Sequence, residues 1–88
     1  MKTILLIEDD RDLNAGLTYD LELEKYKVFS AFTLAEGREI LACEAPDLIL
    51  LDGNLPDGDG FDFCRTVKSK HDIPVIFLTA RDMEQEEM

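Results

Sequence analysis

The sequence predicts an α/β fold in which a parallel sheet carries helices on both faces. Four short apolar segments alternate along the chain with three segments of helical periodicity. The connections between them are short, and this alternation is typical of a doubly wound parallel sheet. The chain has 88 residues and shows no internal repeat, low-complexity segment or linker, so it predicts one small domain.

The first strand is expected at residues 3–7, where Thr3-Ile-Leu-Leu-Ile7 is apolar without alternation. Such a run is typical of a strand that is buried on both faces. After three acidic residues, leucines recur at spacings of four, which predicts an amphipathic helix over about residues 12–25. The leucines of this stripe are Leu13, Leu17 and Leu21.

The second strand is expected at residues 27–31, which are rich in β-forming residues and alternate weakly, as near a sheet edge. Thr33 and Glu36 form a capping box that predicts the start of a second helix, from Leu34 to about residue 44. Four residues of this helix are expected to face the sheet: Leu34, Gly37, Ile40 and Leu41.

The third apolar run, residues 48–52, ends at Asp52 and predicts a central strand. Pro56, Gly58 and Gly60 predict a loop after it. A third helix is expected from Phe61 to near residue 69, followed by a fourth apolar strand at 74–79. Residues 81–88 are charged and predict the start of another helix.

Composition narrows the classes of function. Hydrophobic residues make up 45% of the chain, so a packed core is expected, and the formal net charge is −11. That charge argues against direct nucleic-acid binding and suits cations or a basic protein surface. Cys43 and Cys64 lack metal-ligand spacing. No apolar segment approaches the roughly 18–20 residues of a membrane span, so we expect a cytoplasmic protein without membrane contact.

Polar residues that can do chemistry follow three of the predicted strands. Glu8 and Asp9 follow the first strand, Asp52 ends the third, and Thr79 ends the fourth. Ligands bind at the carboxyl ends of parallel strands, so these groups are expected to converge if their strands are neighbours in the sheet. Two unit charges about 5 Å apart repel by about 3 kcal/mol at an effective dielectric near 20, so a cation such as Mg²⁺ is expected among them. A carboxylate beside Mg²⁺ is well placed to attack a phosphoryl group.

Three motifs in order resemble the receiver domain of bacterial two-component response regulators. They are Ile-Leu-Leu-Ile-Glu8-Asp9-Asp10, then Leu-Leu-Asp52-x-x-Leu-Pro56 with Asp59-Gly60-Phe61, then Pro-Val-Ile-Phe-Leu-Thr79-Ala80-Arg81. The last motif is most similar to the branch of transcription factors with a winged-helix DNA-binding domain. The resemblance implies a flavodoxin-like fold with strand order 2-1-3-4. It also implies signalling rather than an enzyme's turnover, at most with self-catalysed phosphorylation and dephosphorylation.

The resemblance also implies a role for each site residue. Asp52 would be the phosphoacceptor for a sensor histidine kinase, with Mg²⁺ as cofactor. Thr79 would be the switch hydroxyl, and Ala80 would leave room for the phosphoryl group. The metal ligands would be Glu8, Asp9, Asp52 and the backbone carbonyl of Asn54. Asp10 is interpreted as a helix-start charge.

The chain departs from the family pattern at its end. A fifth strand, a fifth helix and the family's lysine have no counterpart in residues 1–88. We therefore expect a C-terminally truncated receiver domain, whose open fourth strand and leucine face favour a homodimer, by edge pairing or by exchange of elements. Transcription would be controlled through an effector domain outside this chain. Two alternatives remain: an inert receiver fragment that dimerises without phosphotransfer, and a Mg²⁺-dependent phosphohydrolase that forms an aspartyl phosphate.

Overall fold

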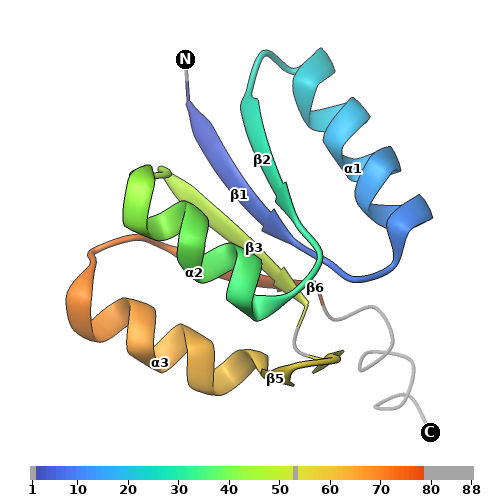
Figure 1. The fold of residues 1–88 in the computed structure, drawn as a ribbon. Coiled ribbons are helices and arrows are strands. Elements are labelled where there is room, and N and C mark those ends of the chain that lie inside the picture. The colour runs from blue at the N-terminus through green and yellow to red at the C-terminus, as the bar shows by residue number, and fades with distance from the viewer. Residues whose placement is uncertain (1, 53, 79–88) are drawn as a thin grey trace, which may run out of the picture.

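The computed structural model describes residues 2–52 and 54–78, and its centre is a parallel sheet (Figure 1). The four strands lie in the order β2-β1-β3-β6, which confirms the predicted order 2-1-3-4. Helix α1 lies on one face of the sheet, and α2 and α3 lie on the other. The elements are β1 (Thr3–Ile7), α1 (Arg11–Leu23), β2 (Lys27–Ala31), α2 (Leu34–Cys43), β3 (Leu48–Asp52), β4 (Asn54–Leu55), β5 (Gly58–Asp59), α3 (Gly60–Lys70) and β6 (Val75–Leu78).

The hydrophobic core lies between the sheet and the α2–α3 layer. Alternate residues of the strands point to this side, because successive side chains of a strand face opposite ways. Leu51 of β3, for example, lies between Ile7 of β1 and Phe77 of β6 in the register. Helices α2 and α3 add Leu34, Phe63 and Val67, all buried, to this cluster. Two residues of this core, Ile7 and Leu51, directly precede Glu8 and Asp52 in the chain.

Gly37 lets α2 approach β1 closely, as its predicted sheet-facing position requires. A Cβ atom at this position would lie 2.5 Å from Cδ1 of Ile7. A side chain at this position would therefore force the buried Ile7 to change its packing. Leu34 is buried, and Ile40 and Leu41 are half-buried against the core, which confirms the predicted inner face of α2.

The opposite face of the sheet is covered less completely. The leucine stripe of α1 packs only in part, since Leu17 and Leu21 are half-buried while Leu13 is 46% exposed. Ile76 of β6 points to the same side as Leu6 and Leu50, with which it is in register, and it is 53% exposed. An apolar area on this face is therefore accessible within the described part of the chain.

Helix α1 begins and ends earlier than predicted. The expected range of 12–25 becomes Arg11–Leu23 because Asp10 caps its start, accepting hydrogen bonds from the backbone N–H groups of Asp12 and Leu13. At its end Lys25 adopts a left-handed conformation with φ 74°. This conformation stops the helix, and the backbone N–H of Tyr26 donates back to the carbonyl of Leu21 at 3.2 Å.

The prediction of an unstructured loop after Asp52 was wrong in part. Strands β4 and β5 form a small antiparallel pair, with Pro56 and Asp57 between them. The carboxylate of Asp57 accepts hydrogen bonds from the backbone N–H groups of Leu34 (2.8 Å) and Ala35 (3.0 Å) at the start of α2. These hydrogen bonds lower the pKa of Asp57. The pair is thus held to the core by α2, a contact between segments that are distant in sequence.

The remaining boundaries agree with the predictions to within one residue, with β6 starting at Val75 rather than at residue 74. Thr79, Ala80 and the helix start expected over 81–88 lie outside the described residues. Within the described part, none of the helices has the length and apolar character needed to cross a membrane.

Candidate functional site

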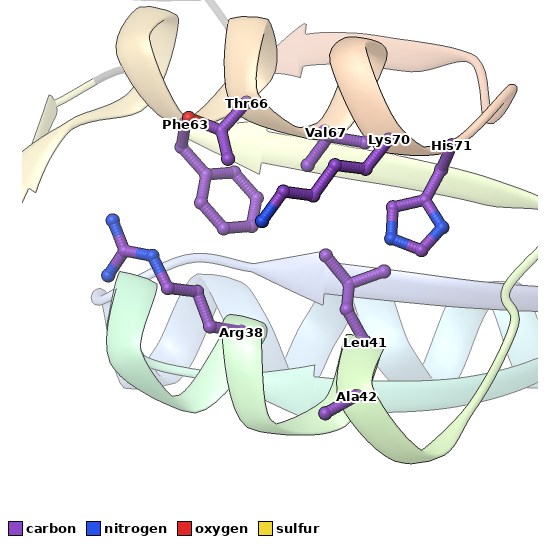
Figure 2. A pocket seen from close by; sticks show the side chains of 8 residues that line it. All are labelled: Arg38, Leu41, Ala42, Phe63, Thr66, Val67, Lys70 and His71. Carbon is purple, nitrogen blue, oxygen red and sulfur yellow. The ribbon is translucent and has the colours of Figure 1, made fainter.

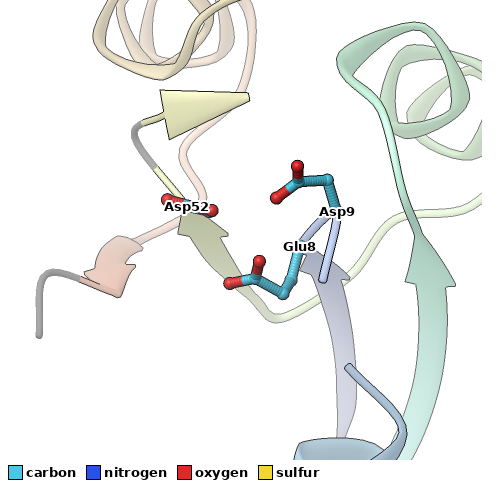
Figure 3. A group of neighbouring side chains, drawn as sticks. All are labelled: Glu8, Asp9 and Asp52. Atoms are coloured by element: carbon cyan, nitrogen blue, oxygen red, sulfur yellow. The ribbon is translucent and has the colours of Figure 1, made fainter. Parts of the chain in front are cut away.

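Three carboxylates meet at the carboxyl edge of the sheet (Figure 3). Glu8 and Asp9 directly follow β1, and Asp52 is the last residue of β3. One carboxylate oxygen from each residue lies within 4.8 Å of the other two. Glu8 and Asp52 are 3% and 2% exposed, whereas Asp9 is open to solvent. The convergence that the sequence predicted for these residues is confirmed.

The register of the central strands brings the carboxylates together. β1 and β3 are parallel neighbours, and Ile7 lies beside Leu51. The residues that come next, Glu8 and Asp52, therefore leave the sheet side by side. Both strands are apolar on both faces, so their burial holds this end of each strand in place.

Burial, together with the neighbouring carboxylates, changes the protonation of Glu8. Burial raises the pKa of Glu8 to about 7 from its ordinary 4.5, and the charge of Asp52 together with side-chain hydrogen bonds to Asp52 and Asp9 acts in the same direction. The backbone N–H of Asp10, which donates to Oε2 of Glu8 at 3.0 Å, opposes this rise. Near neutral pH the cluster therefore holds a proton that a cation would displace.

Asn14 of α1 supports the site, and sequence reasoning missed it. Its side chain is 2% exposed and its Nδ2 donates to the carbonyls of Glu8 (3.0 Å) and Ala31 (3.2 Å). Thr18 Oγ1 donates to its Oδ1 at 3.3 Å. Asn14 thus joins α1 to the ends of β1 and β2 and fixes the backbone that carries Glu8. The signal available in the sequence was a polar residue next to the leucine stripe, on the side of α1 that faces the sheet.

The other predicted site residues have different outcomes. Asp10 caps α1, which agrees with its interpretation as a helix-start charge. Asn54 opens β4 two residues after Asp52, and its carbonyl as a metal ligand stays a prediction. The roles of Thr79 and Ala80 also stay predictions, since both residues lie outside the described part of the chain.

Comparison with known proteins identifies the family. The family model described as the response regulator receiver domain matches residues 4–88. The chain belongs to the response regulator receiver domain family. Among curated proteins, this receiver domain is 40% identical over 88 residues to the KDP operon transcriptional regulatory protein KdpE of Escherichia coli (strain K12). The match covers 100% of the chain and 39% of KdpE, so the chain spans about two fifths of that relative's length.

Solved structures of receiver domains are also similar. The non-phosphorylated HemR receiver domain from Leptospira biflexa is 42% identical with a TM-score of 0.80, covering 88% of this chain and 63% of that one. The BeF3-activated N-terminal receiver domain of Klebsiella pneumoniae RstA is 29% identical with a TM-score of 0.82, covering 86% and 65%. These matches confirm the receiver fold, and the likeness to KdpE agrees with the transcription-factor branch predicted from the sequence.

Proposed function

We propose that this receiver domain accepts a phosphoryl group on Asp52 in a Mg²⁺-dependent reaction. The observation that carries the proposal is the buried Asp52 carboxylate at the end of the central strand β3, beside Glu8 and Asp9. The phosphodonor is a phosphohistidine of a sensor histidine kinase, as the family implies. The chain itself acts in signalling rather than in substrate turnover.

The transfer can be written from the chain's own groups. A carboxylate oxygen of Asp52 attacks phosphorus, and a P–O bond forms while the P–N bond of the phosphohistidine breaks. The departing imidazole nitrogen keeps the electron pair and takes up a proton. The product is an acyl phosphate on Asp52. Strand β3 holds the nucleophile, while the burial around it limits attack by water.

The donor set fits a hard divalent cation. Carboxylate oxygens are ligands that Mg²⁺ prefers, and Glu8, Asp9 and Asp52 supply them within 4.8 Å of one another. The pKa of Glu8, raised mainly by burial and also by the charge of Asp52, supports a place for a cation beside these carboxylates. A bound Mg²⁺ supplies charge neutralisation at the transferring phosphoryl oxygens. The carbonyl of Asn54 is the proposed further ligand, and Thr79 and Ala80 are proposed to contact the phosphoryl group.

The phosphoacceptor is tested by incubating the protein with Mg²⁺ and acetyl phosphate and measuring its intact mass. One added phosphoryl group is expected, and it should vanish with EDTA or in Asp52→Asn. Asp20→Asn, which removes an exposed carboxylate from α1, is the matched control and should be phosphorylated as the wild type is. Peptide mapping that places the phosphate on Asp9, Asp10 or Thr79 would overturn the assignment.

The same incubation separates the alternatives that the sequence left open. Rapid turnover of an added phosphomonoester would indicate a phosphohydrolase, and no reaction at all would indicate an inert receiver fragment. The metal site is tested separately by titrating Mg²⁺ or Mn²⁺. Asp52→Asn should weaken binding whereas Asp20→Asn should not, and equal affinities in both variants would exclude the site.

We propose control of transcription as the output, exerted through an effector domain outside this chain. The similarity to KdpE, a transcriptional regulatory protein of E. coli, supports this output. Direct nucleic-acid binding by residues 1–88 is not proposed, because the net charge of −11 opposes contact with phosphates.

We also propose that the domain forms a homodimer. It is supported by the exposed Ile76 on β6, the end strand of the described sheet, and by the exposed Leu13. Apolar strand edges favour pairing with other chains, by strand addition or by exchange of elements. Sedimentation equilibrium at micromolar concentration should show a dimer that dissociates in Ile76→Glu. A stable 10.0 kDa monomer would contradict the proposal.

A further inference from the structure

A groove between α2 and α3 lies on the face of the sheet that these two helices cover (Figure 2). None of the three clustered carboxylates is among its lining residues. Its volume is about 370 Å³, within the size range of small-molecule sites. The inner wall is formed by apolar side chains of both helices, Leu41, Phe63 and Val67. Phe63 and Val67 are buried core residues, so this wall is anchored to the hydrophobic core.

The charged side chains that line the groove have the same sign. They are Arg38 of α2 and Lys70 of α3, and Figure 2 shows both side chains extending over the space between the helices. None of the lining residues is a carboxylate, although Asp and Glu make up 20 of the 88 residues. This is a local concentration of cationic groups on a chain with a net charge of −11.

The two cations are available to a ligand. The guanidinium of Arg38 lies 5.6 Å from the centre of the Phe63 ring, at the wall of the groove. Among the described residues, the salt bridge that forms joins Arg65 to Asp62 on the exposed side of α3, so it involves neither Arg38 nor Lys70. Asp57, the carboxylate whose pKa Arg38 helps to lower, is already occupied by the backbone N–H groups at the start of α2.

We propose that the α2–α3 groove binds a small carboxylate with an apolar body, such as an aromatic acid. The apolar body would rest on Leu41 and Ala42, the apolar lining residues that are not buried, above the buried ring of Phe63. The carboxylate would receive hydrogen bonds from Arg38 and Lys70, which reach the groove from opposite helices. An arginine guanidinium matches the planar shape of a carboxylate, and such charge-assisted hydrogen bonds are stronger than neutral ones. The groove is separate from Asp52, so the proposal does not depend on phosphotransfer.

The test compares two probes that share a naphthyl body, one with a charged carboxylate and one with an uncharged amide. ¹⁵N-labelled protein is titrated with 1-naphthylacetate and, separately, with the uncharged 1-naphthaleneacetamide, and amide shifts are followed by NMR. Saturable shifts confined to α2, α3 and the residues packed against them are expected for the acid. The amide should bind about ten-fold more weakly, since it loses the charge-assisted hydrogen bonds.

Substitutions test whether Arg38 and Lys70 cause the preference for the acid over the amide. Arg38→Gln combined with Lys70→Gln should reduce the affinity for the acid to that for the amide. Arg65→Gln combined with Lys68→Gln changes the net charge by the same amount on exposed positions of α3 and should keep the preference. Equal affinities of the two probes for the wild type, no saturable binding, or shifts centred on Asp52 would each overturn the proposal, whether or not the variants fold.

Discussion

Replacing Glu8 by glutamine should remove most of the pH dependence of stability near neutrality. In the folded protein the pKa of Glu8 is about 7, against an ordinary value of 4.5. An acid whose pKa is raised by folding stabilises the folded state below pH 4.5, and this contribution is lost as the pH rises through 7. At about 1.4 kcal/mol per pH unit, the full loss is about 3 kcal/mol.

The substitution keeps the shape of the side chain and its hydrogen bond from Asp10, because the Oε1 of glutamine can still accept from that N–H. At about pH 5 the two proteins should have similar stability, since Glu8 is mostly protonated there. At about pH 8.5 in EDTA, Glu8→Gln should be the more stable, with a gain of roughly 2–3 kcal/mol over the difference at pH 5.

Urea unfolding followed by circular dichroism measures this difference, and Glu22→Gln on the exposed side of α1 is the matched control. The control should follow the wild type at both pH values. Added Mg²⁺ should stabilise the wild type more at pH 8.5 than at pH 5, because metal binding needs ionised carboxylates. If the wild type and Glu8→Gln differ by the same free energy at both pH values, the electrostatic account of the cluster is wrong.

Three further substitutions test the packing around the site, each by urea unfolding. Gly37→Ala should lower the free energy of unfolding by about 1–2 kcal/mol, since the clash with Ile7 exceeds the gain in helix propensity, and an unchanged value would show that α2 moves away at little cost. Asn14→Leu should cost about 1–3 kcal/mol by leaving the buried carbonyl of Glu8 without its side-chain donor, and it should also slow phosphorylation of Asp52. An unchanged free energy of unfolding would show that Asn14 does not support the site. Lys25→Gly should stabilise the protein by about 0.5–1 kcal/mol because its φ of 74° favours glycine, and a loss of stability would contradict this.

The sequence by itself determined the four strands of the main sheet, the three helices and their order along the chain. The runs at β1 and β3 are apolar without interruption because both faces of these central strands are buried, and this pattern is visible without any tertiary contact. The same holds for the convergence of Glu8 and Asp52. The carboxyl ends of parallel strands lie at one end of a sheet, so residues that follow neighbouring strands converge, and the resemblance to receiver domains predicted the strand order that makes β1 and β3 neighbours.

Only the tertiary structure decided the features that depend on contacts between distant segments. The β4–β5 pair forms in a stretch rich in turn residues. Asp57, which lies between the two strands, accepts hydrogen bonds from two backbone N–H groups at the start of α2, and these groups are 22 and 23 residues away from it in sequence. Asn14 carries no motif, and its role follows from the two strand ends that α1 happens to cover. The pKa of Glu8 depends on its burial and on its distance from Asp52, which are set by how β1 and β3 pack. Local patterns specify elements and faces, whereas hydrogen bonds and charges between elements act over a few ångströms and need the assembled fold.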